Sequence, residues 1–206
     1  MGSEAACKAH FGKTKLTGKA LLETAELIFR PADGSPSRKL PFSTIKSAQA
    51  IDGQLHVQTP NGPAIFELGL TAEKWCHKIL HPKTRAEKLG VKPGIHVSLL
   101  GDFDPDFFRE LRAATKNVYE GKFDATSDLI FLSVNSAKNL APALNKATKS
   151  IKGATALWIV YPKGQKEITE IDVLSSGRKA GLKDVKIVGF SPTHTALKFV
   201  VPLDKR

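Results

Sequence analysis

The chain has 206 residues, of which 41% are hydrophobic and 25% are charged, the balance of a globular protein of one or two domains. A net charge of +11, most of it in residues 83–206, favours weak attraction to polyanions, but specific nucleic-acid recognition is not expected. No apolar run approaches the roughly 20 residues that span a bilayer, and the first residues lack the apolar core of a secretory signal. Two distant cysteines exclude a disulfide framework, so we expect a cytoplasmic protein.

Short strands and tight turns are predicted for the first third of the chain. Asp52–Gly53 and Asn61–Gly62 each lie between runs rich in apolar residues and are strong hairpin signals. The pattern therefore predicts a meander, with apolar or alternating segments at 20–29, 39–42, 45–51, 54–59 and 64–68.

An amphipathic helix is predicted at Leu70–Leu80, with Thr71 as its N-cap. Many short antiparallel strands followed by one such helix resemble a pleckstrin-homology-like barrel, in which Trp75 would plug one open end. We therefore expect this barrel in residues 1–82. Residues 83–94, with a short helical piece and a Pro93–Gly94 turn, are expected as a linker.

Strands and helices alternate in residues 95–206. Two apolar runs, 129–134 and 156–161, are typical of strands buried on both faces. The short Ser191–Thr195 connection requires the last two strands to be antiparallel. Strands are expected at 95–100, 118–122, 129–134, 156–161, 185–190 and 196–201, and helices at 105–114, 140–151 and 169–180. Asp104 and Thr169 are expected as N-caps.

This order, with the segments DLIFL (128–132) and ALWIVY (156–161), resembles the Rossmann-like sheet of methyltransferases. The resemblance implies a three-layer α/β domain in residues 95–206 and an S-adenosylmethionine site at the first strand-to-helix turn. It also implies an acidic ribose ligand, for which Glu120 is the candidate. The turn itself reads GDFDPD (101–106), with one glycine and three carboxylates, so we expect it to be filled and to bind no cofactor.

A second resemblance covers Lys88–Val201. The phrases KLGVKPG (88–94), ALWIVYPKG (156–164) and GLKDVKIVGFSPTHTALKFV (181–200) are similar to an uncharacterised bacterial family of unknown function. That family is sometimes found behind a small β-rich module. It implies the same degenerate methyltransferase-like fold and no established activity.

Candidate ligand-binding residues follow from the rule that open parallel sheets bind ligands beyond the carboxyl ends of their strands. They are Asp102, Asn135, Lys163, Lys166, Thr169 and His194. Lys163 and Lys166 would attract an anion at the helix start near Thr169, and His194 could move a proton near neutral pH. The competing interpretation makes the lysines solvated turn residues and His194 an exposed loop residue.

No metal site is expected from the sequence. Asp102, Asp104 and Asp106 could bind magnesium, but a helix-capping role for Asp104 explains that aspartate more simply. His77 and His81 are one helical turn apart and lack a clear third ligand.

Three functions are compatible with these patterns. The preferred one is a non-catalytic binding or interaction protein that recognises a protein or a small anionic ligand. The alternative is a transferase-type enzyme with an atypical site at the carboxyl edge of the α/β sheet. The third is a weak polyanion binder, for phosphoinositides or nucleic acid, that uses Lys13, Lys15 and Lys19.

Overall fold

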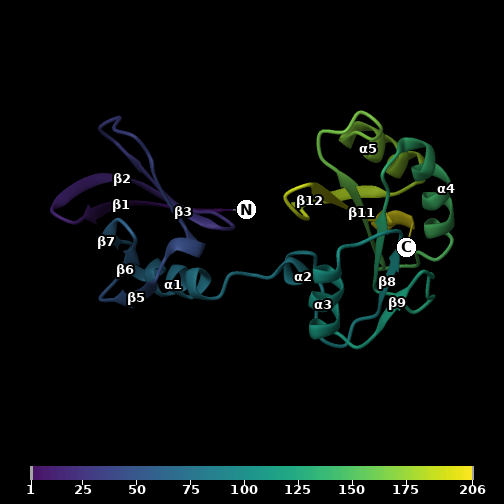
Figure 1. Ribbon diagram of the computed structural model, residues 1–206, viewed down its shortest axis with the longest axis horizontal. Coiled ribbons are helices and arrows are strands. Elements are labelled where there is room, and N and C mark those ends of the chain that lie inside the picture. The colour runs from purple at the N-terminus through teal and green to yellow at the C-terminus, as the bar shows by residue number, and fades with distance from the viewer. Residues whose placement is uncertain (1, 206) are drawn as a thin grey trace. The chain divides into compact units, whose positions relative to one another are not determined.

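A computed structural model describes residues 2–205, and the chain divides into two compact units, Met1–Lys83 and Thr84–Arg206 (Figure 1). The boundary lies next to the predicted one, but residues 84–94 belong to the second unit instead of forming a linker.

The first unit contains one curled antiparallel sheet of seven strands. Its spatial order is β4-β3-β2-β1-β7-β6-β5, and the helix α1 (Ala72–Leu80) packs against β5 and β6. The strands are β1 (Ser3–Phe11), β2 (Thr14–Leu22), β3 (Glu26–Pro31), β4 (Arg38–Pro41), β5 (Ser47–Ile51), β6 (Gln54–Thr59) and β7 (Gly62–Glu67). A short 3-10 helix at Phe42–Thr44 connects β4 to β5, and another at Gly69–Thr71 connects β7 to α1.

An aromatic core fills this unit. Phe29 and Phe66 are fully buried with ring centroids 6.0 Å apart, and Trp75 of α1 is buried in the same cluster. Both predicted hairpins are confirmed, with the first turn at Asp52–Gly53; the second turn is Pro60–Asn61, one residue earlier than predicted, because Gly62 already pairs with Thr59. Thr71 is the N-cap residue of α1, as predicted, but its hydroxyl donates to the carbonyl of Leu68 and makes no capping hydrogen bond with a helical amide.

The second unit is a six-stranded mixed sheet with helices on both faces. The spatial order is β12-β13-β11-β10-β8-β9, in which β9, β8, β10 and β11 are parallel. The strands are β8 (Val97–Leu100), β9 (Val118–Glu120), β10 (Leu129–Ser133), β11 (Ala156–Pro162), β12 (Lys183–Gly189) and β13 (His194–Val200). The last two strands pair antiparallel, as predicted.

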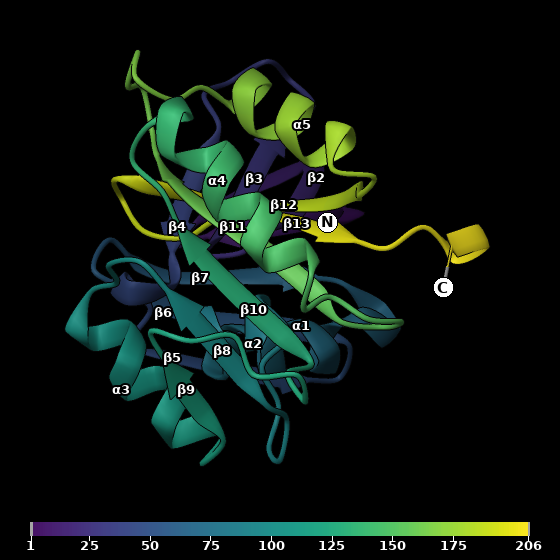
Figure 2. The ribbon, with the colours of Figure 1, turned by 90° about the vertical axis from the view of Figure 1, so that its right-hand side faces the viewer.

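Four helices cover this sheet. They are α2 (Arg85–Lys88), α3 (Pro105–Ala114), α4 (Ala137–Thr148) and α5 (Glu170–Lys179), followed near the end of the chain by a 3-10 turn at Leu203–Lys205. Figure 2 shows α4 and α5 together on one face of the sheet and α3 on the other. The caps predicted for α3 and α5 are both present. Within residues 2–205, none of the helices has the length and apolar character that crossing a membrane requires.

The residues expected as a linker are anchored on the second unit's sheet. A capping box between Thr84 and Glu87 starts α2, and Leu89 and Val91 are buried. The indole Nε1 of Trp158, in β11, donates a buried hydrogen bond of 2.9 Å to the carbonyl of Leu89. This bond holds the end of α2 against the sheet and removes the freedom that a linker would have.

Replacing Trp158 tests this anchor. Trp158→Phe leaves the Leu89 carbonyl buried without its donor, so we expect a loss of about 1–3 kcal/mol in the free energy of unfolding, beyond any packing loss. Phe131→Leu is the matched control, because Phe131 stacks on Trp158 in the same layer and its ring makes no hydrogen bond. Urea unfolding measures both variants, and an equal loss in the two would show that the hydrogen bond contributes nothing.

Candidate functional site

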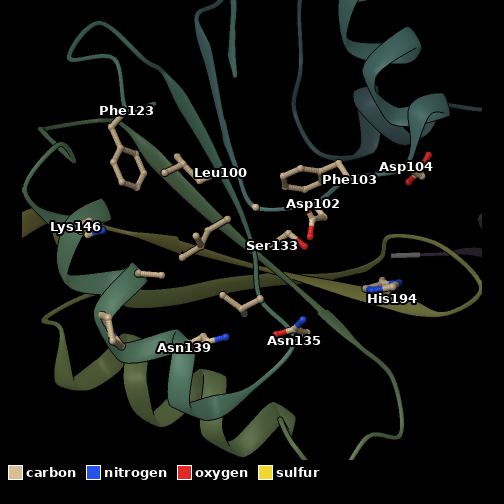
Figure 3. A pocket seen from close by; sticks show the side chains of 15 residues that line it. Leu100, Asp102, Phe103, Asp104, Phe123, Ser133, Asn135, Asn139, Lys146 and His194 are labelled. Carbon is tan, nitrogen blue, oxygen red and sulfur yellow. The ribbon is translucent and has the colours of Figure 1, made fainter. Parts of the chain in front are cut away.

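A pocket of about 710 Å³ opens at the carboxyl ends of β8 and β10. From β8 the chain passes through α3 to β9, which pairs with one edge of β8, and it then returns to β10, which pairs with the other edge. The connections therefore reverse direction between β8 and β10, which makes this a topological switch point. Such a point is where open α/β sheets bind their ligands. The lining residues are Leu100–Asp104, Phe123, Leu132–Asn135, Asn139, Pro142, Ala143, Lys146 and His194 (Figure 3).

The pocket is open because the connection from β9 to β10 is a loop. Residues 121–128 cross the sheet face where a helix usually packs, and hydrogen bonds to Ser98 Oγ hold them there. Ser127 Oγ lies 2.7 Å from this atom, and the amide of Asp124 donates to it over 3.0 Å. Phe123 of the same loop lines one end of the pocket, a role that the sequence pattern did not indicate.

The turn after β8 packs closely against β10. Gly101 has φ +85°, and a Cβ built on it would lie 2.4 Å from the carbonyl oxygen of Ser133. The glycine is therefore required for packing. Phe103 contacts the rings of Phe107, Phe108 and Phe190. The expectation that this turn is filled needs correction, because Phe103 joins an aromatic cluster and leaves space between Asp102 and α4.

Gly101→Ala tests this close approach. Alanine in a left-handed conformation costs about 1–2 kcal/mol on its own, and here the Ser133 carbonyl must also move. Gly121→Ala is the matched control, because Gly121 has φ +70° with nothing within 4 Å of the added Cβ. We expect Gly101→Ala to lower the free energy of unfolding by about twice as much as the control. Equal losses in urea unfolding would contradict the packing argument.

Arg85 clamps the opposite side of the turn. Its guanidinium donates two hydrogen bonds to Asp104 (2.8 and 2.9 Å), reaches Glu110 at 3.1 Å, and lies over the rings of Phe107 and Phe190. Asp104 also accepts the amide of Phe107 as the N-cap of α3. The Arg85 hydrogen bonds, with help from that amide, lower the pKa of Asp104 below its ordinary 3.8. This cluster lines a second pocket of about 670 Å³, which shares five lining residues with the first: Asp102, Phe103, Asp104, Ser133 and His194.

The lowered pKa of Asp104 predicts an acid-sensitive contribution to stability. The contribution is fully present above the unfolded-state pKa and is lost as the pH falls through the depressed folded-state pKa, that is, below about pH 4. Asp104→Asn keeps a capping oxygen but removes the charge. We expect its free energy of unfolding to fall less than that of the wild type between about pH 5 and pH 2, by at most about 1 kcal/mol because Asp104 is partly exposed.

Urea unfolding across this pH range measures the difference. Asp106→Asn is the control, since that exposed carboxylate pairs only with the exposed Arg109. An acid sensitivity of Asp104→Asn equal to that of the wild type would contradict the ion-pair assignment.

The structure brings together three of the six residues predicted for the site. Asp102, Asn135 and His194 line the pocket, whereas Lys163, Lys166 and Thr169 are not among its lining residues. The ammonium of Lys163 donates to the carbonyls of Ser191 (2.7 Å) and Pro192 (3.4 Å) and so closes the β12–β13 hairpin.

The helix start near Thr169 is already capped. Thr169 Oγ1 accepts the amide of Asp172, and the Asp172 carboxylate accepts the amide of Thr169. The chain's own capping box thus takes the place that an anion was expected to have at this helix start.

The pocket has two polar ends with an apolar wall between them. Asp102 is exposed and makes no ion pair or hydrogen bond with the described residues, whereas Asp104 is neutralised by Arg85. Figure 3 shows Asp102 and His194 toward one side and Lys146 with Phe123 toward the other. This arrangement suits a small, partly apolar molecule whose positive group faces Asp102.

A metal centre has no support in residues 2–205, where no group of three or more His, Cys, Asp or Glu side chains is placed to hold an ion. The rings of His77 and His81 lie 4.7 Å apart. Glu120, the candidate ribose ligand, forms an ion pair with Arg112 of α3.

No family model and no curated protein matches the chain. Similar solved structures include an S-adenosylmethionine-dependent methyltransferase from Aquifex aeolicus, at 16% identity and TM-score 0.45, with 55% of this chain and 85% of that chain covered. Fibrillarin from Aeropyrum pernix with natively bound S-adenosyl-L-methionine has 15% identity and TM-score 0.38, and the match covers 97% of this chain and 100% of that chain. An N-terminal PH domain of a human protein has 10% identity and TM-score 0.35, and the match covers 50% of this chain and 90% of that chain. At these identities the likeness concerns the fold, and no function is inferred from it.

Proposed function

We propose that the second unit is a transferase-type domain, methyltransferase-like in fold, which binds a small positively charged molecule between β8 and β10. The carrying observation is that an open pocket coincides with the switch point of the sheet, with the unpaired carboxylate of Asp102 at its edge. A carboxylate without a partner favours a cation far more than a phosphate. The site differs from the usual cofactor site of methyltransferase-like sheets, because the turn after the first strand is not rich in glycine.

S-adenosylmethionine fits the chemistry of this pocket. Bound there, it would supply a methyl group on a sulfonium cation. Asp102 would face a positive group of the molecule, Asn135 and Asn139 offer amide donors and acceptors, and Leu100 and Phe123 offer apolar surface to its flat ring. The molecule has no phosphate, so the anion cradle that a glycine-rich turn gives to a dinucleotide is not needed.

Binding without turnover is the second candidate function. One observation favours it: Nδ1 of His194 lies 2.9 Å from Thr193 Oγ1, so the one histidine at the pocket already has a partner. The transferase interpretation remains open, because methyl transfer depends mainly on holding the acceptor in line with the donor and requires no covalent intermediate with a protein residue.

We propose that the first unit is a pleckstrin-homology-like barrel. It would serve as an interaction module whether or not the second unit is catalytic.

Calorimetry with S-adenosylmethionine and S-adenosylhomocysteine tests the proposal, since only the former carries the sulfonium charge. We expect Asp102→Asn to weaken S-adenosylmethionine binding about tenfold, the equivalent of about 1.4 kcal/mol, and to weaken S-adenosylhomocysteine binding less. Asp106→Asn, on the same turn but outside the first pocket, is the control and should leave both affinities unchanged.

Binding of neither compound to the wild type would contradict the proposal. Tight binding with no S-adenosylhomocysteine formed in the presence of amine, hydroxyl and thiol acceptors would favour the non-catalytic role.

A further inference from the structure

The outward side of α4 carries an uncompensated row of lysines. Residues 129–166 contain six lysines and no aspartate or glutamate. Four of them belong to α4 and the residues that follow it: Lys138, Lys146, Lys149 and Lys152, all exposed. Figure 2 shows α4 lying across the front of the second unit with its outer side toward the viewer.

The helical period places these lysines opposite the buried side. Leu140, Leu144 and Ala147 pack into the core of the second unit. At about 100° per residue, Lys138 and the C-cap residue Lys149 point within roughly 20° of each other and nearly opposite Leu140 and Leu144. They are separated by about 16 Å along the helix axis. Lys138 and Lys149 therefore share the solvent-facing side of α4, whereas Lys146 lies about 80° around the helix from Lys138 and also lines the pocket.

Carboxylates do not pair with these four lysines as they do with two lysines of the first unit, Lys15 and Lys19. Lys15 lies 3.5 Å from Glu67, and Lys19 lies 3.2 Å from Glu4, so two of the three lysines expected to bind polyanions are already paired. None of the four α4 lysines forms an ion pair with any residue in 2–205. The outward side of α4 therefore carries positive charge that no carboxylate in residues 2–205 pairs with.

We infer that the outward side of α4 binds the phosphate backbone of nucleic acid without reading its sequence. Exposed lysines are point charges suited to phosphates, and the exposed Asn145 on the same side as Lys138 and Lys149 adds a hydrogen-bond donor. A membrane surface is the less suitable partner, because this side has no residue more apolar than Ala141 and Pro142, whereas interfacial helices insert Trp, Phe or Leu. Three of the four lysines, Lys138, Lys149 and Lys152, lie outside the lining of the ligand pocket, so the inference does not depend on the proposed ligand.

Salt-dependent binding of the full chain to a fluorescent mixed-sequence DNA duplex tests it. Four phosphate contacts predict a slope of about −3.6 in log K against log salt, and an affinity about a hundredfold lower at 200 mM than at 50 mM salt. The triple variant Lys138→Gln, Lys149→Gln, Lys152→Gln leaves Lys146 in the pocket. We expect it to reduce the slope by about 2.7 and to weaken binding at 50 mM salt at least tenfold.

The control variant removes the same charge elsewhere, with Lys13→Gln, Lys39→Gln and Lys46→Gln, three exposed lysines outside the ion pairs of the first unit. It should retain most of the wild-type slope. The inference is overturned if the wild type does not bind the duplex at 50 mM salt. It is also overturned if the two variants lose affinity equally, or if phosphatidylserine vesicles are bound through these lysines and the duplex is not.

Discussion

The contact between Gly101 and the carbonyl of Ser133 is the constraint on which the second unit's site depends. A side chain at position 101 cannot be accommodated, so the turn after β8 lies directly on the end of β10. With the backbone held there, Phe103 joins the aromatic cluster of Phe107 and Phe190. Asp102 is left at the edge of the open space, with no hydrogen-bond or ion-pair partner among residues 2–205. One close approach therefore determines both the shape of the pocket and its charge.

Arg85 completes this arrangement from the other side. Its guanidinium pairs with Asp104 and Glu110 and lies over two aromatic rings, so α2 and the start of α3 are joined by charge and by packing. Since Asp104 is neutralised, the site's free negative charge is concentrated on Asp102. The loop between β9 and β10 then leaves part of the sheet face uncovered, and Leu100 and Phe123 supply apolar surface there.

Local signals predicted the elements well. The caps Asp104 and Thr169 each bond to an amide three residues further along, and each hairpin loop has two residues. Because these features are local, the sequence pattern predicted the two caps and the two hairpins. The β1–β2 hairpin was not predicted as such, because its inward side chains Ala5, Cys7 and Ala9 are small and give a weak alternation. Residues 83–94 were expected as a linker. The hydrogen bond from Trp158 to Leu89, which anchors part of this segment, joins residues 69 positions apart, and no local pattern reveals it.

The candidate site was predictable in part. Asp102, Asn135 and His194 follow strands whose carboxyl ends meet, which a strand order alone can indicate. Phe123 was not predicted, because its place depends on the loop between β9 and β10. Asn139 and Lys146 were not predicted either, because they line the pocket from α4 and their place depends on how that helix packs on the sheet. Lys163 was assigned to a ligand, but its ammonium is engaged by the carbonyls of the β12–β13 hairpin, a contact over 28 positions that no local pattern reveals.

Mapping of backbone amide signals during titration with S-adenosylmethionine tests the central claim most directly. A ligand at the switch point predicts the largest NMR shift changes at 101–103 and 134–135, with the signals of β1 to β7 unmoved. Changes confined to other segments, or none at saturating concentration, would contradict the assignment of the site.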